Sequence, residues 1–363
     1  MSIIIFIIIL FVLVVSHEFG HFIVAKKSGM RVDEFSFGFP PKLFGFKKGE
    51  TTYNINLLPL GGYVKIFGEN NTEDDKEDKS NKRSFKNKPL WSQALVLCAG
   101  VTMNFLLAWL LLSVGFITGL PSSVSQAPEG SVVLNQALTI TSVTPNSPAL
   151  KSGLKVGDKI LSLKTINDIT ETPSADSVRY FIKNHGNENI TVTYNRASEK
   201  LETNVVPENS TDGSPVIGIS MDVIGKLQLP IHQALWEGLK LSSSLFVSTI
   251  SGFYNLIRDG VTGHGNLSAL SGPVGIVGVV GDAAKFGFVY LLSFTALISI
   301  NLAVINLIPF PALDGGQLLF LLIEKIKGSR INPKVANIVN MVGFAVLMLL
   351  MVIITYHDII KLL

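Results

Sequence analysis

The chain has 363 residues, of which 47% are hydrophobic and only 16% carry a charge, and its mean hydropathy is +0.43. This composition excludes a simple soluble globular protein, whose surface needs more charged residues. The formal net charge of +3 is small, and the basic residues are spread over loops beside apolar segments, which excludes the common nucleic-acid-binding classes. The composition predicts a polytopic α-helical membrane protein with a soluble insertion.

Four apolar segments are long enough to cross a bilayer. They cover residues 1–25, 90–119, 286–308 and 335–356. The first segment lacks the basic start and the small-residue cleavage site of a removable signal peptide, so we expect it to remain as a transmembrane helix. The single cysteine, Cys98, lies in the second segment, and an intrachain disulfide is therefore excluded.

An H-E-x-x-H pattern at residues 17–21 lies near the end of the first segment. On a helix, this spacing puts the imidazoles of His17 and His21 on one face, where they can bind zinc, and Glu18 can act as a base toward water at the metal. The alternative is two surface histidines beside a solvated glutamate. It is disfavoured because ionisable side chains inside a spanning helix are costly unless they serve a function. The pattern therefore predicts part of a catalytic zinc site.

Residues 34–67 are rich in aromatic residues, glycine and proline. Partial alternation of apolar and polar residues, interrupted by turn residues, favours short hairpin strands over a helix, and an ordinary loop is the alternative. Residues 70–87 are polar and charged without apolar periodicity, which predicts a flexible linker.

The distribution of lysine and arginine predicts the orientation in the membrane. The loop from Lys26 to Lys88 is much richer in these residues than the stretch 120–285. By the positive-inside rule, the loop is cytoplasmic and the long stretch is extracytoplasmic. Both termini then face outward, and His17 and His21 lie in the inward half of the first span.

Residues 120–228 have the pattern of a compact β-rich domain. Ser147 suits a helix N-cap, Pro148 suits the first helical position and Gly153 suits a left-handed stop, which together predict a short helix. Strands are predicted at 190–194, 201–205 and 216–220.

Part of this domain resembles the circularly permuted PDZ domains of bacterial proteases. The resemblance lies in the run from Pro145 to Asp158 and in the closing Ile217, Gly218 and Ile219. It implies that these three closing residues receive an extended peptide or protein segment by β-addition. A β-rich spacer without a peptide site is the alternative.

Residues 229–285 connect this domain to the third span. The segment 235–257 has an uncharged centre and charges near its ends, so it could cross the bilayer or lie at its surface. Crossing would reverse the next span and carry its C-terminal end to the outer face, away from His17 and His21. We therefore predict an interfacial amphipathic helix and a connecting loop.

Two histidines leave a catalytic zinc ion one protein ligand short. At the inner end of the third span, residues 306–316 read N-L-I-P-F-P-A-L-D-G-G. Two prolines break the helix there, and irregular backbone at this depth is tolerated where a cavity such as an active site surrounds it. Asp314 is the predicted third ligand, and the alternative is that it caps the following helix.

The H-E-x-x-H pattern, the PDZ-like insertion and the N-x-x-P-x-P-x-L-D-G-G run together resemble the site-2 protease family of intramembrane zinc metalloproteases. Within that family, the chain is most similar to the bacterial regulator-of-sigma-E protease branch, over nearly its whole length. The resemblance implies one Zn²⁺ per chain, held by His17, His21 and Asp314. It also implies that Glu18 is the general base and that Asn306 holds the substrate or the oxyanion.

The resemblance further implies that residues 35–63 form a membrane re-entrant β-region that pairs with the substrate. The candidate substrate-binding residues there are Phe37, Gly38, Phe39, Gly61, Gly62 and Tyr63. The chain departs from the family pattern at Pro40, where a second glycine is common, and at Val101, where proline often follows the glycine. It also has room for one PDZ domain where the best-known members carry two.

The expected domain plan follows the chain. Residues 1–119 hold the first two spans and the β-region, 120–228 the PDZ domain, 229–285 the interfacial helix and loop, and 286–363 the last two spans. The PDZ domain and both termini would be extracytoplasmic, in a bacterial cytoplasmic (inner) membrane. The active site would lie near the cytoplasmic side of the lipid bilayer.

The implied function is cleavage of the transmembrane segments of single-span membrane proteins, such as a pre-trimmed anti-sigma factor or remnant signal peptides. A transporter or metal carrier is an alternative, disfavoured because the second and fourth spans contain no Asp, Glu, His, Lys or Arg. A catalytically silent PDZ scaffold is another, disfavoured by the intact Glu18.

Overall fold

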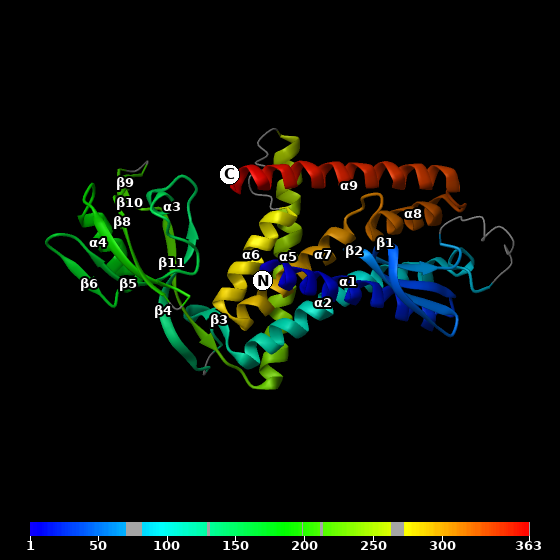
Figure 1. Cartoon of the computed structure of the whole chain (residues 1–363), viewed down its shortest axis with the longest axis horizontal. Coiled ribbons are helices and arrows are strands. Elements are labelled where there is room, and N and C mark those ends of the chain that lie inside the picture. The colour runs from blue at the N-terminus through cyan, green and yellow to red at the C-terminus, as the bar shows by residue number, and fades with distance from the viewer. Residues whose placement is uncertain (70–81, 129–130, 198, 211–212, 263–271, 363) are drawn as a thin grey trace. The chain divides into compact units, whose positions relative to one another are not determined.

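The structure is a computed structural model that describes residues 1–69, 82–128, 131–197, 199–210, 213–262 and 272–362. The chain divides into two compact units (Figure 1). The first consists of Met1–Val114 with Leu235–Leu363, and the second is Gly115–Ala234. Of the linker predicted at 70–87, residues 70–81 lie outside the described residues, and a short 3-10 helix, η2 (Phe85–Asn87), lies near its end.

The first unit is built mainly from helices. They are α1 (Ser2–Lys27), α2 (Leu90–Thr118), α5 (Ile231–Val261), α6 (Pro273–Phe286), α7 (Phe288–Leu307), α8 (Asp314–Lys327) and α9 (Pro333–Leu362) (Figure 1). Among the described helices, α1, α2, α7 and α9 are long and apolar enough to cross a membrane. The four predicted spans are therefore confirmed in length and composition.

Two helices differ from the expected plan. α5 is longer than the predicted segment 235–257, and it is not among the described helices that meet the length and composition of a span. α6 occupies residues for which the sequence predicted a connecting loop. It begins with Pro273 in its first turn and ends at Phe286, and the following Gly287 has a φ of +116°, which favours glycine. Residues 263–271 lie outside the part of the chain that the structure describes.

Apolar side chains pack several of these helices together in separate buried clusters. Ile9 and Leu13 of α1 pack with Val280 of α6, and Ala108 of α2 packs with Ile300 of α7. α1 also approaches α2 closely at Gly20, where an added Cβ would lie 2.7 Å from the carbonyl carbon of Ala99. Small residues permit such close approach between spanning helices. The approach brings the histidine-bearing face of α1 against α2.

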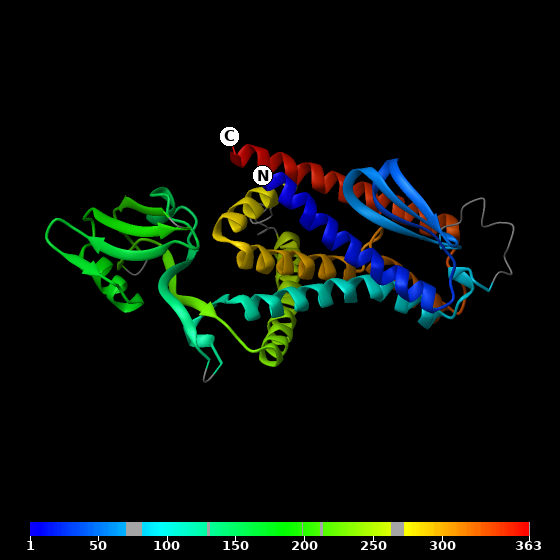
Figure 2. The ribbon, with the colours of Figure 1, turned by 60° about the horizontal axis from the view of Figure 1, so that its bottom comes forward.

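Two long strands, β1 (Val32–Lys48) and β2 (Thr51–Ile66), form a separate sheet in the same unit. Both strands bend, so that residues 34–37 of β1 pair with 62–65 of β2 on one side and with 52–55 on the other. The predicted strand structure is confirmed, but the strands are long and bent and not short. The sheet lies beside α1 (Figure 2).

Several apolar side chains in the later part of β1 and the middle of β2 are exposed. Leu43 and Phe44 are 63% and 62% exposed, and Leu57 is 51% exposed. An exposed apolar surface of this kind marks an interaction site or contact with lipid.

The second unit is a β-sheet with two short helices. Its sheet has the order β3-β11-β4-β5-β7-β8, with β6 paired to β5. The strands are β3 (Leu120–Ser123), β4 (Val133–Val143), β5 (Lys159–Lys164), β6 (Ile169–Glu171), β7 (Ile190–Arg196), β8 (Glu199–Val205) and β11 (Ile219–Leu227), with the small pair β9 (Glu208–Asn209) and β10 (Pro215–Val216) beside them. The helices are α3 (Pro148–Lys151) and α4 (Ala175–Asn184), and a 3-10 turn, η3 (Val124–Gln126), follows β3.

The predicted short helix is confirmed as α3. The Ser147 hydroxyl accepts a hydrogen bond from the Leu150 amide at 3.3 Å, and Pro148 opens the helix. Gly153 follows in the left-handed conformation with a φ of +83°. The helix closes over a core that includes the fully buried Ile140 and Leu154.

A buried ion pair fixes the loop between α3 and β5. The Asp158 carboxylate has no exposed surface and accepts hydrogen bonds from Arg196 Nε at 2.8 Å, Arg196 Nη2 at 2.7 Å and the Lys155 amide at 2.8 Å. We expect Asp158→Ala to lower the free energy of unfolding of this unit by roughly 2 to 3 kcal/mol, because the buried donors lose their acceptor. Pulse proteolysis of the full chain in urea measures this free energy.

Glu208→Ala is the matched control for this prediction. Glu208 also forms an ion pair, with Lys151 at 3.0 Å, but both side chains are more than half exposed. Exposed ion pairs contribute little to stability. Equal losses in the two variants would contradict the importance assigned to the buried pair.

Candidate active site and metal centre

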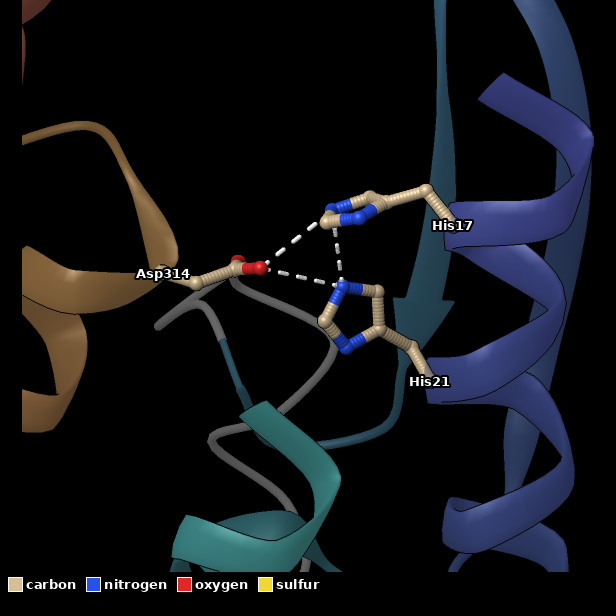
Figure 3. A group of neighbouring side chains, drawn as sticks. All are labelled: His17, His21 and Asp314. Atoms are coloured by element: carbon tan, nitrogen blue, oxygen red, sulfur yellow. Dashed lines mark hydrogen bonds and ion pairs between the residues drawn. The ribbon is translucent and has the colours of Figure 1, made fainter. Parts of the chain in front are cut away.

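Three side chains from two helices point at one another in the first unit. His17 and His21 lie one turn apart on α1, and Asp314 is the first residue of α8 (Figure 3). The two Nε2 atoms are 3.2 Å apart, and they lie 3.2 and 3.3 Å from Asp314 Oδ2. These ligand atoms form a cluster that could hold a metal ion.

The donor set and its surroundings fit zinc. Two imidazole nitrogens and one carboxylate oxygen form a ligand set of a catalytic zinc site, which keeps one position open. Asp314 Oδ2 is buried and, apart from the two Nε2 atoms, has no polar partner among the described residues. Both histidines are only 8% exposed, so the cluster is shielded from bulk solvent. The residues present therefore suit a bound zinc ion.

Gly100 of α2 forms the wall beside the two imidazoles. A Cβ added there would lie 2.6 Å from His17 Cε1 and 2.7 Å from His21 Cε1. Real Cβ atoms essentially never approach other atoms so closely. The two imidazoles therefore fit beside α2 only because Gly100 has no side chain.

The loop before α8 carries Asp314 to the histidines. α7 ends at Leu307, and the following prolines cannot continue its hydrogen bonding. The loop then folds back over the first turn of α8, where a Cβ on Gly316 would lie 2.7 Å from the carbonyl carbon of Phe310. Leu313, and not Asp314, occupies the N-cap position. The carboxylate faces His17 and His21, so the capping alternative does not describe its contacts.

A cavity of about 470 Å³ opens from this cluster. It is lined by the three clustered side chains, by Glu18 and by the edge of β2 from Gly62 to Ile66. The Val64 backbone is a hydrogen-bonding neighbour of the Glu18 carboxylate. A Cβ on Gly62 would lie 3.1 Å from Glu18 Cγ, so the strand runs directly past this side chain. The Glu18 carboxylate, the three side chains that could hold a metal ion and an edge of β2 thus share one cavity.

This arrangement has the parts of a metallopeptidase site, and the comparison with known proteins agrees. A family model described as Peptidase family M50 matches residues 5–350. The chain belongs to peptidase family M50. The regulator of sigma-W protease RasP of Bacillus subtilis is 32% identical, over 99% of this chain and 98% of that protein.

Other relatives of this M50 peptidase carry similar names. The zinc metalloprotease RasP of Shouchella clausii is 31% identical, over 98% of each chain. A Clostridium perfringens protein named provisionally as a zinc metalloprotease is 38% identical, over 96% of this chain and 95% of that protein. A solved PDZ domain of the SdrC-like protein from Listeria monocytogenes matches 25% of this chain and 92% of that chain, with 18% identity and a TM-score of 0.21, a similarity too low to carry an argument. The family match and the similarity to these relatives over nearly the whole chain identify this chain as a zinc metalloprotease.

Only some of the predicted substrate-binding residues of the β-region line the cavity beside Glu18. Gly62 and Tyr63 line the cavity of this M50 peptidase. Phe37 is buried, with its ring centroid 4.7 Å from that of Phe11, and Phe39 is 41% exposed. Gly38 is at the bend of β1 with a φ of +80°, and Gly61 lies against the Phe39 ring. Phe37, Gly38, Phe39 and Gly61 are therefore not among the residues that line the cavity.

The remaining predicted site residues lie outside the cavity. Asn306 is half-buried in the last turn of α7 and is not among the residues that line it. Ile217, Gly218 and Ile219 line a separate cavity of about 570 Å³ within the second unit. Gly218 has a φ of +79° and its carbonyl accepts a hydrogen bond from the Thr144 amide.

The sequence analysis missed several residues of this site. Val96, Gly100 and Asn104 of α2 all contact His17 or His21. Their spacing of four residues puts them on one helix face, which was the available signal. Glu69 also lines the cavity, and burial raises the pKa of its carboxyl group to about 7. Its position beside a polar linker gave no sign of this environment.

Proposed function

We propose that this peptidase cleaves the transmembrane segments of single-span membrane proteins within the bilayer. The observation that carries the proposal is the position of Glu18 and its neighbouring histidines in the C-terminal half of a helix with the length and composition of a membrane span. Ionisable groups at such a position are costly and are retained for function. The catalytic cluster would therefore meet its substrate inside the membrane.

The proposed orientation follows from charge distribution. The loop between α1 and α2 is rich in lysine and arginine, which favours the cytoplasmic side. Both termini lie at the same end of the first unit in Figure 1 and Figure 2, which supports the proposal that both face outward. The active site would then lie near the cytoplasmic side, in a bacterial inner membrane.

The proposed mechanism assigns proton transfer to Glu18. Zinc, when bound, supplies Lewis acidity that polarises the scissile carbonyl and activates water. The Glu18 carboxylate accepts a proton from the attacking water and returns it to the leaving nitrogen. Asn306 is proposed as a hydrogen-bond donor to the developing oxyanion, from the end of α7. His17, His21 and Asp314 would hold the metal.

The edge of β2 is proposed to bind the scissile segment. Residues 62–66 pair with β1 on one side, and several of them line the cavity on the other. A helical substrate hides its carbonyl groups in its own hydrogen bonds, so it must unwind before attack. Pairing with a strand edge replaces the hydrogen bonds that unwinding removes. Phe37, Gly38, Phe39 and Gly61 would then support the strand bend and not contact the scissile bond.

The second unit is proposed to act as a PDZ domain. Its cavity at Ile217, Gly218 and Ile219 lies beside α4, and Arg179 and Lys183 of that helix also line the cavity. An extended peptide could add to the edge of β11 there. The domain could alternatively exclude substrates with large outer portions, so that earlier trimming permits entry. An anti-sigma factor and remnant signal peptides are the proposed substrates.

Removal of the metal is expected to stop cleavage. The purified chain, loaded with zinc in liposomes, should cut a single-span substrate in a gel assay. A chelator should abolish the cleavage, and added zinc should restore it. An intact substrate together with zinc ions crossing the liposome membrane would instead favour the carrier alternative. An intact substrate without transport would favour the silent scaffold.

A further inference from the structure

We propose that Asn104 is a positioning residue for the metal centre, because its side-chain oxygen accepts a hydrogen bond from His17 Nδ1 and so presents Nε2 to the metal. Asn104 lies in α2 and has no exposed surface. Its amide is 3.2 Å from His17 Nδ1. The inference rests on the zinc site of the proposed function and adds the residue that orients one of its ligands.

The chemistry of the histidine decides which end of the amide faces it. A neutral imidazole that binds a metal through Nε2 carries its proton on Nδ1, which must then donate. With the amide nitrogen turned toward Nδ1, the Asn104 oxygen is buried without a hydrogen-bond partner. Oxygen and nitrogen of an amide have nearly the same shape, so a half-turn of the group exchanges them without other movement. After that turn, the oxygen accepts from His17 Nδ1.

The second ligand histidine is held in the same manner by the same helix. His21 Nδ1 lies 2.8 Å from the backbone carbonyl oxygen of Val96, which can only accept. His21 therefore carries its proton on Nδ1 and directs Nε2 toward Asp314. Val96 and Asn104 are two turns apart on α2, with Gly100 midway between them. One face of α2 thus supplies an acceptor to each histidine and leaves space for the metal ligands between the two acceptors.

The position of Asn104 is itself fixed by α7. The Ser299 hydroxyl donates a hydrogen bond to the Asn104 carbonyl oxygen at 2.7 Å, and both residues are fully buried. This bond uses the backbone of Asn104 and leaves its side chain for His17. A side chain held in this way can orient a ligand, because hydrogen-bonded partners of metal ligands commonly set ring orientation and basicity.

Three variants of the full-length chain test the inference. In Asn104→Leu, the acceptor is lost while the size is similar, and the zinc dissociation constant should rise by about 10- to 100-fold. In Asn104→Asp, the side chain can still accept from His17 Nδ1, and the constant should stay within a few-fold of the wild-type value. Thr102→Val is the control, because Thr102 is exposed on the same helix and its hydroxyl, among the described residues, bonds only to the Cys98 carbonyl oxygen one turn earlier. Competition with a chromogenic chelator measures all three constants.

Two further measurements separate positioning from general packing. The thermal unfolding temperature of the metal-free Asn104→Leu chain should match that of the metal-free wild type within a few degrees. The absorption bands of the Co²⁺-loaded chain should shift in Asn104→Leu but not in Asn104→Asp, because His17 changes its orientation only in the former.

The inference is overturned if Asn104→Leu binds zinc as the wild type does, or if Asn104→Asp loses as much affinity as Asn104→Leu. It is also overturned if the Leu variant loses zinc only together with its metal-free stability. None of these outcomes depends on proteolysis. A wild-type chain that binds zinc but cuts no substrate would contradict the proposed function and leave this inference to be judged by metal affinity.

Discussion

Glu18→Gln is expected to abolish peptide cleavage and to leave zinc bound. Glutamine has nearly the shape of glutamate but cannot accept the proton of the attacking water. General-base catalysis by a side chain contributes about 10²- to 10⁴-fold, so the cleavage rate should fall by about a thousandfold. Glu18 is not one of the three clustered ligands, so zinc stoichiometry should stay at the wild-type value. Gel assays of a reconstituted substrate and elemental analysis of the purified variant give both quantities.

Glu50→Gln is the control for this variant. The Glu50 carboxylate forms ion pairs with Lys26 and Arg83, whose hydrogen bonds lower its pKa, and it does not line the catalytic cavity. This change should leave cleavage near the wild-type rate. Cleavage at the wild-type rate by Glu18→Gln would show that another group is the base. The inactive variant should also retain bound substrates, which mass spectrometry of the purified complex can identify.

Gly100→Ala is expected to eliminate both zinc binding and cleavage. The new methyl group would lie 2.6 and 2.7 Å from ring carbons of His17 and His21, which cannot move away while both remain ligands. In the interior of an exposed helix, alanine is favoured over glycine by roughly 1 kcal/mol, so the helix itself should not be weakened. The expected defect is therefore local to the metal centre.

Metal content and substrate cleavage by the purified Gly100→Ala chain test this expectation. Gly252→Ala in α5 is the matched control, because nothing lies within 4 Å of its added Cβ. That variant should bind zinc and cut substrate as the wild type does. Zinc bound by Gly100→Ala with wild-type affinity would show that α2 does not lie against the ligands in the manner described.

The three side chains of the candidate metal centre could be predicted to lie together because each has its own chemical character. His17, His21 and Asp314 lie in short patterns within apolar surroundings, where ionisable residues are rare. Val96 acts through a backbone carbonyl, which every residue possesses, and Gly100 acts by having no side chain. Apart from their spacing, neither residue type indicates such a role in the sequence. They become visible only when α2 is packed against α1.

The β-region and α6 illustrate a second limit. Alternating residues predicted strands in 34–67, and β1 and β2 are there. Their bends and the two-sided pairing of residues 34–37 depend on contacts between distant residues, which local patterns do not encode. α6 is short and rich in valine and glycine, which are weak helix formers. Packing of Val280 against Ile9 and Leu13 of α1 stabilises this helix.

The three proposed metal ligands lie far apart in the sequence, so the candidate metal centre is completed late in biosynthesis. His17 and His21 enter the membrane with the first helix, whereas Asp314 belongs to a helix that follows the third span. A nascent chain that lacks its C-terminal part holds only two of the three proposed ligands, together with the proposed general base. Proteolytic activity should therefore be absent until translation is nearly complete. The order of synthesis would protect neighbouring membrane proteins from a partly assembled enzyme without any separate inhibitory segment.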